Sequence, residues 1–483
     1  INLLNKDFFV IFFGKFIQVI IAIATIKIST ALLPPKEMGS IYLFLTIQTF
    51  FVFTFISPLG QYTNRKTHNW NDNKTIIDNL FLLSVYILII GIISIFVGYT
   101  LYYFFNVGGN ITIKPFLLLL FGYTVLLSLN QTFIPMLNML SFRMDFTILT
   151  ILTSLGVLIL GYLLINAYYP KAEVWLSAIL LSNLIFAIFG YYLIKKRVNS
   201  KFSGFSNLLI KLKNYDFKSL IKILIPISIA TLFMWLQNSG YRIIIEQKIS
   251  LEYLGYLGVG LAVSSQIASI FESILTQYLA PIYYKKISNQ TNIEDRTESF
   301  NWLLNIKLPM YFLLALYVTI FSEYLIGIVV DEEYKGVYIF TVFGIWIEFF
   351  RMMTNVLYSV SLSEFKTRKI ILPYVVGSFT TIFLVYLSSG SLEYEFYLPI
   401  ALVIGGIVTM SSMYFEMKKL LNFTIDSKLF YISIFLSSVY CFIFIFNFDK
   451  SFINSMLIIF TSGIYFLGTI FLVYKKNFLY DNS

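Results

Sequence analysis

Long apolar stretches, each able to cross a lipid bilayer, follow one another through the whole 483-residue sequence. A helix needs about 20 apolar residues to span the hydrocarbon of a membrane. Because backbone groups facing lipid must be hydrogen-bonded within the segment, such spans are α-helices. The predicted fold class is therefore an all-α polytopic membrane protein of about 14 transmembrane helices, at roughly 8–33, 39–60, 76–104, 115–140, 147–168, 174–194, 221–245, 255–283, 303–330, 337–361, 371–389, 397–417, 429–447 and 453–474.

Positive charge alternates between the connectors that join these spans. Every second connector is rich in Lys and Arg, as at 195–201 and 418–428, whereas the others carry only isolated lysines. Cytoplasmic loops are the ones that hold such an excess, so the basic set is predicted to be cytoplasmic. We call the opposite side the outer side. An even number of spans then places both the N-terminus and the C-terminus in the cytoplasm.

Composition excludes several classes of protein. Hydrophobic residues make up 58% of the sequence and charged residues 12%, which is about half of what a soluble domain carries. The net charge of +10 comes from juxtamembrane loops, so it indicates contact with anionic membrane lipids and not with nucleic acid.

Cysteine and histidine are too rare for the usual metal and nucleophile sites. Cys441 and His68 each occur once, which excludes an internal disulfide and an ordinary zinc site. No G-x-x-x-x-G-K-[ST] motif is present to hold a nucleotide phosphate. We therefore expect no metal, no cofactor and no enzymatic activity.

The chain divides at its longest connector. Residues 1–194 hold the first six spans, 195–220 form a basic linker, 221–417 hold the next six, and 418–483 add two more. We interpret the linker as an amphipathic segment on the cytoplasmic interface, with a plain tether as the alternative. Residues 33–42 (LPPKEMGSIY) and 249–256 (ISLEYLGY) both place Glu before Gly and an aromatic residue after it. The prediction is two six-helix lobes in a parallel repeat plus two C-terminal helices.

Polar side chains at membrane depth are the best indication of function, because a charge at the bilayer centre costs about 2.5–3.5 kcal/mol on insertion scales. The candidates fall into three groups. The cations are Lys15, Lys27, Arg242, Lys307 and Arg351; the acids nearest mid-depth are Glu272 and Glu348; and the neutral polar residues on the same helix faces are Gln18, Asn238, Ser265, Ser269 and Asn355.

Each group also has a structural interpretation. Glu348 and Arg351, three residues apart, can neutralise each other, and Lys27, Arg242 and Lys307 can extend toward the interface. The serines can serve helix packing. The alternative is a shared hydrophilic cavity, in which the excess of cations favours an anionic, phosphate-type substrate.

Several short segments carry a family resemblance. Four segments resemble the corresponding segments of Wzx-type O-antigen flippases. They are residues 14–42, which begin with GKF and end with the segment at 33–42; residues 58–70, which begin with PLGQYTNR and end at Trp70; residues 226–242; and residues 330–336 (VDEEYKG). These flippases belong to the multidrug/oligosaccharidyl-lipid/polysaccharide (MOP) exporter superfamily. That family often has an acidic residue beside the arginine at the start of its second half, where this chain has Tyr241 before Arg242.

The resemblance implies a bacterial inner-membrane transporter with a central cavity lined largely by spans 1, 2, 7 and 8. Its implied substrate is an undecaprenyl-pyrophosphate-linked oligosaccharide, an O-antigen or related repeat unit, moved from the cytoplasmic to the periplasmic leaflet. The cations would hold the pyrophosphate. Coupling to H+ or Na+ is implied, with Glu272 as the first candidate acid and Glu348 as the second, and the polysaccharide polymerase and chain-length machinery are implied partners.

Two alternatives stay open. A membrane polysaccharide polymerase or glycosyltransferase usually needs a sizeable outer loop, and all outer loops predicted here are short. A multidrug or cation antiporter of the same superfamily favours an acidic or aromatic cavity, whereas cations predominate here.

Overall fold

The computed structural model describes residues 6–206, 208, 217–288, 292–364, 366–444 and 448–480. These residues form helices and contain no β-strand. Twelve of the helices are long and apolar enough to cross a membrane. The predicted fold class, an all-α polytopic membrane protein, is confirmed.

The seventh and thirteenth predicted spans are not among these twelve helices. The seventh consists of α10 (Phe217–Trp235), a π-helical turn η3 (Leu236–Gly240) and α11 (Tyr241–Lys248). The thirteenth consists of α17 (Ser427–Ser437) and the 3₁₀ segment η6 (Ser438–Phe444). Each therefore consists of several shorter pieces, as do the second and fourth predicted spans, which contain η1 and η2.

Two compact units make up the chain, Ile1–Gly255 and Tyr256–Ser483. The first unit includes the seventh predicted span and the first turn of α12 (Leu251–Ser288). The two units are defined by which residues contact each other in the fold. The predicted division at 195–220 is instead defined by the repeat in the sequence. The predicted repeat boundaries therefore stay a prediction.

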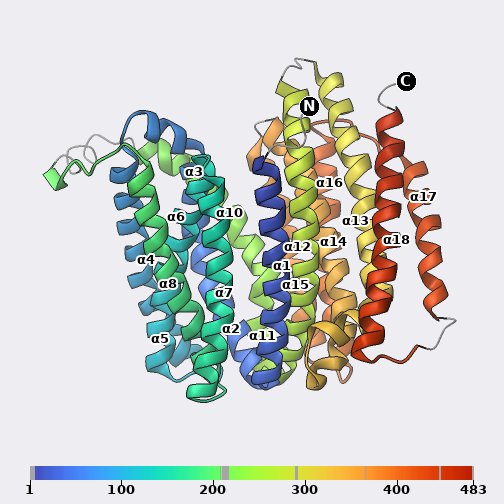
Figure 1. The fold of residues 1–483 in the computed structure, drawn as a ribbon, viewed down its shortest axis with the longest axis horizontal. Coiled ribbons are helices and arrows are strands. Elements are labelled where there is room, and N and C mark those ends of the chain that lie inside the picture. Colours follow the sequence, from blue (N-terminus) through green and yellow to red (C-terminus); the bar gives the residue numbers. More distant parts are fainter. Residues whose placement is uncertain are drawn as a thin grey trace. The chain divides into compact units, whose positions relative to one another are not determined.

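Helices of the first unit run roughly parallel or antiparallel to one another (Figure 1). Helix α1 packs on α7, α7 packs on α8, and α10 packs on η1 and α3. The elements are α1 (Lys6–Leu32), α2 (Pro35–Phe51), η1 (Val52–Ile56), α3 (Ser57–Asp72), α4 (Ile76–Phe105), α5 (Ile113–Gly122), η2 (Tyr123–Leu127), α6 (Ser128–Met139), α7 (Arg143–Ala167), α8 (Ala172–Arg197), α10, η3 and α11.

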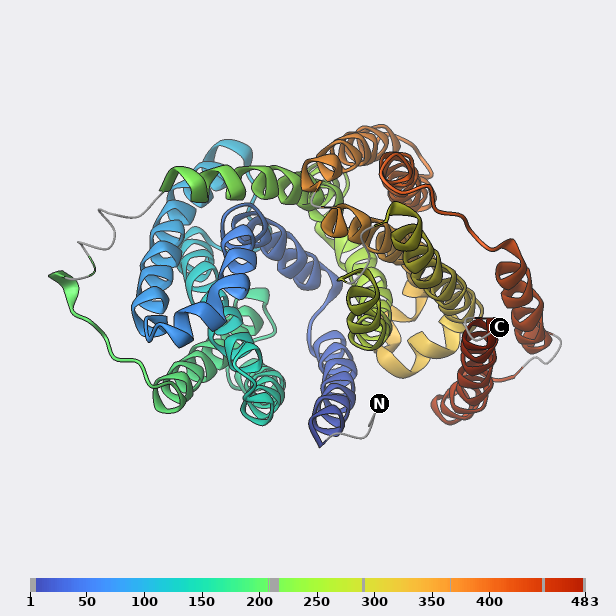
Figure 2. The same cartoon turned by 90° about the horizontal axis from the view of Figure 1, so that it is seen from above.

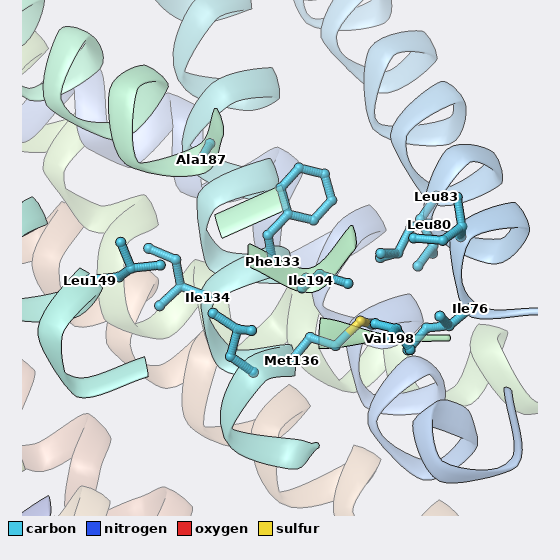
Figure 3. Close-up of a cluster of buried hydrophobic side chains, with 12 residues drawn as sticks. Ile76, Leu80, Leu83, Phe133, Ile134, Met136, Leu149, Ala187, Ile194 and Val198 are labelled. Atoms are coloured by element: carbon cyan, nitrogen blue, oxygen red, sulfur yellow. The ribbon is translucent and has the colours of Figure 1, made fainter. Parts of the chain in front are cut away.

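An apolar cluster packs four helices of this unit together. Leu80 of α4, Phe133 and Ile134 of α6, Leu149 of α7 and Ile194 of α8 are all buried in it (Figure 3). Lipid tails are as apolar as leucine, so close packing, and not escape from water, has to hold these helices together inside a membrane.

Helix α13 is central to the second unit, because it packs on α14, α17 and α18. Seen along the helices, α17 and α18 lie at the edge of this unit (Figure 2). The elements are α12, α13 (Ile293–Val329), η4 (Glu332–Val337), α14 (Tyr338–Ser363), η5 (Thr367–Ile370), α15 (Ile371–Ser388), α16 (Tyr394–Lys418), α17, η6 and α18 (Phe452–Tyr480).

Three π-helical turns, η1, η2 and η3, interrupt helices of the first unit. A π turn adds a residue to the helical turn, and such turns are frequent at functional sites. Counting 100° per residue along this span would put Thr231, Asn238 and Arg242 on one helix face, but that face runs across η3. Beyond η3 that arithmetic no longer applies, so Arg242 is shifted off the face that carries Thr231.

The described part of the connector between α8 and α10 packs against the turn between α3 and α4. Ser200 Oγ donates a hydrogen bond to the carbonyl oxygen of Lys74 (2.8 Å), and the backbone N–H of Ser203 donates to Asp78 Oδ1 (2.9 Å). The predicted amphipathic stretch continues through 209–216, which lies outside the described residues.

Candidate functional site

Five polar side chains from three helices form a charged cluster in the second unit. Its members are Glu272 on α12, Lys307 on α13, and Glu348, Arg351 and Asn355 on α14. Arg351 lies at the centre. Its Nη2 donates to Glu272 Oε2 at 2.9 Å, and its Nε donates to Glu348 Oε2 at 2.5 Å. One guanidinium therefore binds two carboxylates.

Glu272 has hydrogen-bond partners on both of its oxygens. Asn355 Nδ2 donates to Glu272 Oε1 at 2.9 Å, while Arg351 occupies Oε2. Asn355 is one turn beyond Arg351, so both donors lie on the same face of α14, as a period of 3.6 residues predicts. Lys307 Nζ donates to Thr276 Oγ1 at 3.1 Å, one turn along α12 from Glu272.

Burial makes this arrangement costly to disturb. The side chains of Arg351, Glu272 and Glu348 keep 25%, 18% and 13% of their exposure, and Lys307 is 6% exposed. The cluster holds two cations and two carboxylates, so it carries no formal excess charge. Partly buried charges are stable only when they are paired and hydrogen-bonded, which is what the cluster provides.

Ser265 and Ser269 precede Glu272 on α12. Ser265 is half-buried, and the exposed Ser269 donates its hydroxyl to the carbonyl oxygen of Gln266 at 3.1 Å. A hydroxyl bonded to its own helix serves the local backbone. The structure therefore places both serines on the helix that carries Glu272, outside the charged cluster.

The remaining predicted cations lie in the first unit. Lys15 and Gln18 are half-buried on α1, where Lys15 Nζ donates to Gln18 Oε1 at 3.3 Å. Lys27 is half-buried on the same helix, closer to its outer end. Asn238 is half-buried within η3. The Lys15–Gln18 pair agrees with the predicted polar face of the first span.

Arg242 lies on α11 against aromatic rings. Its guanidinium is 5.5 Å from the ring centre of Tyr42 and 5.8 Å from that of Tyr241, within the range of cation–π attraction. Arg242 Nε is buried and has no hydrogen-bond partner among the described residues, and the same holds for Oε2 of Glu246. Buried polar atoms without partners are rare and call for an explanation, such as a bound ligand, ion or water.

Sequence reasoning missed Glu246 and Tyr42. The spacing of four residues from Arg242 to Glu246 on a helix was an available indication, because such residues are neighbours on the helix surface. No comparable signal pointed to Tyr42, since it comes from a different helix.

Within the described residues, no group of three or more His, Cys, Asp or Glu side chains is arranged to hold a metal ion. Lys15, Lys27 and Arg242 belong to the first unit, and Lys307 and Arg351 belong to the second. A single cavity lined by all five cations therefore stays a prediction.

Comparison with known proteins finds likeness in structure only. Neither a family model nor a curated protein matches the sequence. The inward-facing form of a multidrug resistance MATE family transporter of the MOP superfamily matches with a TM-score of 0.65 and 12% identity, covering 83% of this chain and 94% of the transporter. The inward closed conformation of the lipid II flippase MurJ matches with a TM-score of 0.66 and 14% identity, covering 97% of this chain and 99% of the flippase. The chain therefore has the multi-pass membrane fold of the MOP superfamily transporters.

Proposed function

We propose that the chain is a flippase that moves an undecaprenyl-pyrophosphate-linked oligosaccharide, an O-antigen or related repeat unit, from the cytoplasmic to the periplasmic leaflet. It works by alternating access, driven by a gradient of H+ or Na+. The protein acts in the bacterial inner membrane with both termini in the cytoplasm, and it delivers its substrate to the polysaccharide polymerase and chain-length machinery.

The proposal rests mainly on the lack of ion pairs at Lys15 and Arg242, two cations of the first unit. Arg242 keeps a buried Nε without a hydrogen-bond partner, and the one described hydrogen bond of Lys15 goes to a neutral amide. Neither has an ion pair among the described contacts of the chain. Cations in an apolar span that make no ion pair are suited to an anionic ligand, and a pyrophosphate accepts several such donors.

We also propose for Arg351 a role other than the predicted binding of substrate. Because it binds both Glu272 and Glu348, its charge is already compensated. We assign it, with Asn355 and Lys307, to the support of Glu272 and Glu348, which are the coupling acids. A proton or Na+ arriving at Glu272 would compete with Arg351 for the same carboxylate, and that competition can move α14 relative to α12.

The extent of the structural match supports a lipid-linked substrate. The match to the lipid II flippase covers nearly the whole of both chains, whereas the match to the MATE transporter covers 83% of this chain. The difference is about the length of one helical hairpin, and α17 and α18 are the two helices that this chain is predicted to have beyond its two lobes. We therefore assign α17 and α18 to contact with the apolar tail of a lipid-linked substrate.

A multidrug or cation antiporter is the second candidate, because the MATE transporter matches with nearly the same TM-score. The two acids of the charged cluster favour it. The two proposals differ in their substrate: a cation antiporter moves labelled organic cations into membrane vesicles, and the flippase does not.

The decisive experiment is a deletion strain. We expect lipid-linked repeat units to accumulate on the cytoplasmic leaflet, and surface polysaccharide to return when the gene is restored. Lys15→Gln should abolish that rescue, and Lys15→Arg should retain it because the charge remains. Lys66→Gln, at an exposed cytoplasmic position, is the matched control. Full rescue by Lys15→Gln and by Arg242→Gln, with both proteins at normal abundance in the membrane, would remove these residues from the substrate site.

A further inference from the structure

One buried carboxylate gathers two lysines at the predicted cytoplasmic ends of α15 and α16. Glu416, in the last turn of α16, is 8% exposed. Its Oε2 lies 3.3 Å from Lys369 Nζ of η5, and its Oε1 accepts a hydrogen bond from Nζ of Lys419, the residue directly after α16. Because both oxygens belong to one carboxylate, the two ammonium groups are held side by side.

The two ammonium groups stay open to the surroundings. The side chains of Lys369 and Lys419 keep 48% and 63% of their exposure, whereas that of Glu416 keeps 10%. Lys418 is also exposed, and its Nζ donates a hydrogen bond to Tyr414 Oη at 3.1 Å. Three lysines and one glutamate leave a net charge of +2 at this place, so it attracts anions.

The cluster lies where two membrane spans end. The segments Thr367–Ser388 and Tyr394–Lys418 are both long and apolar enough to cross a membrane. Lys369 belongs to the first turn of one segment, and Lys419 follows the last residue of the other. Lipid headgroups lie at this depth, and basic clusters at the cytoplasmic ends of transmembrane helices bind anionic headgroups.

Exposed apolar side chains continue from both lysines into the spans. On α15 they follow Lys369 at intervals of three or four residues, so they share one face of the helix. They are Leu372, Val376, Phe379 and Phe383. On α16, Phe415 lies one turn before Lys419 and is 64% exposed. Because α15 and α16 pack on each other, both sets of side chains can contact one lipid whose headgroup lies at the lysines.

We propose that Lys369, Lys419 and Glu416 form a binding site for an anionic phospholipid of the cytoplasmic leaflet. The two lysines bind the phosphate of the headgroup, and Glu416 holds them together. The acyl chains lie along the exposed face of α15 and on Phe415. Two adjacent ammonium groups match the two free oxygens of a phosphodiester, with charge-assisted hydrogen bonds. The inference rests on the membrane fold and not on the proposed function.

Photo-cross-linking in nanodiscs locates the bound lipid. The full-length protein is placed in phosphatidylcholine that contains a trace of phosphatidylglycerol with a photoactivatable group in its acyl chain. We expect the label on peptides from α15 and from the end of α16. Phosphatidylcholine carrying the same group should label these peptides far less. Equal labelling by the two lipids would show that the headgroup is not recognised, and the site would be rejected.

A triple variant tests the lysines. Lys369→Gln and Lys419→Gln remove both cations, and Glu416→Gln removes the buried carboxylate that would otherwise be left without a partner. The preference of α15 labelling for phosphatidylglycerol over phosphatidylcholine should fall about 25-fold, the equivalent of about 1 kcal/mol for each lysine. Lys196→Gln is the matched control, because it lowers the net charge by the same one unit at an exposed position in the last turn of α8. It should leave the preference unchanged.

Three outcomes would overturn the proposal. The first is an unchanged preference in the triple variant at normal membrane abundance. The second is an equal loss in Lys196→Gln, because the attraction would then come from net charge alone. The third is stronger competition by undecaprenyl pyrophosphate than by unlabelled phosphatidylglycerol, which would assign the site to a polyprenyl-linked ligand. Labelling requires no transport, so these results do not depend on whether the proposed function is correct.

Discussion

Removing the guanidinium of Arg351 should destabilise the second unit more than any other single change to its charged cluster. Arg351→Met keeps most of the side-chain volume but leaves Glu272 and Glu348 without their shared cation. Breaking a buried ion pair by removing one partner costs about 3–5 kcal/mol. Since the three side chains keep 13–25% of their exposure, solvent screens part of that loss, and we expect the lower end, about 3 kcal/mol.

Thermal unfolding of the protein in lipid nanodiscs, followed by tryptophan fluorescence, measures this effect. For a folding unit of this size, 1 kcal/mol shifts Tm by about 2–4 °C, so Arg351→Met should lower Tm by about 6–12 °C. Adding Glu348→Gln removes one stranded carboxylate and should recover about half of the loss. Arg351→Lys keeps the charge but cannot bind two carboxylates with one planar fork, so it should lie between the wild type and Arg351→Met.

Arg368→Met is the matched control, because Arg368 is exposed on η5 and its loss should leave Tm within about 1 °C. If Arg351→Met unfolds at the same temperature as Arg368→Met, the two carboxylates are solvated and the network does not hold the helices together. A double variant no more stable than Arg351→Met alone would show that Glu348 has no part in it.

Three further predictions concern other contacts. Trp235→Phe removes the hydrogen bond from Nε1 to a backbone carbonyl of α2 (2.9 Å) and should cost about 1 kcal/mol, seen as a Tm lower by a few degrees. The pKa of Lys450 is raised above its ordinary value of 10.5, first of all by its hydrogen bond to Glu323. The stability from this pair should therefore be fully present below the ordinary pKa of about 10.5 and lost as pH rises through the higher folded-state pKa, so the Tm profiles of wild type and Lys450→Gln should converge once pH exceeds that folded-state pKa. Gly377→Ala places a Cβ 1.8 Å from Thr409 Oγ1 and should cost about 1–3 kcal/mol, measured as reduced Tm and membrane abundance.

Where a helix is continuous, hydropathy and periodicity were sufficient to predict the span and which of its residues share a face. The span at 337–361 is one unbroken helix, α14, so counting 100° per residue correctly placed Arg351 and Asn355 on a shared face that points to Glu272. The span at 221–245 contains η3, and nothing in its composition announces a π turn. Counting 100° per residue from Asn238 to Arg242 therefore crosses an irregularity that the sequence does not reveal.

The sequence could not predict which side chains from distant parts of the chain contact each other. Glu348 was recognised as a possible local partner of Arg351, because the two are three residues apart. Glu272 is far away in the chain, and only the packing of α12 against α14 brings its carboxylate to the guanidinium. In the same way the echo around Gly39 and Gly255 was visible as a pattern, but that the two glycines meet backbone to backbone depends on how two helices cross.

The candidate cations differ in whether a carboxylate of the chain neutralises their charge, and this difference has a measurable consequence. Arg351 is bound to two carboxylates, so its replacement should lower stability and impair transport together. Lys15 donates to one neutral amide at 3.3 Å, so Lys15→Gln should cost less than about 1 kcal/mol while removing a charge that we propose binds the substrate. Transport per folded molecule should therefore fall far more for Lys15→Gln, although its Tm stays close to that of the wild type. The opposite ranking would place the anion-binding function in the second unit.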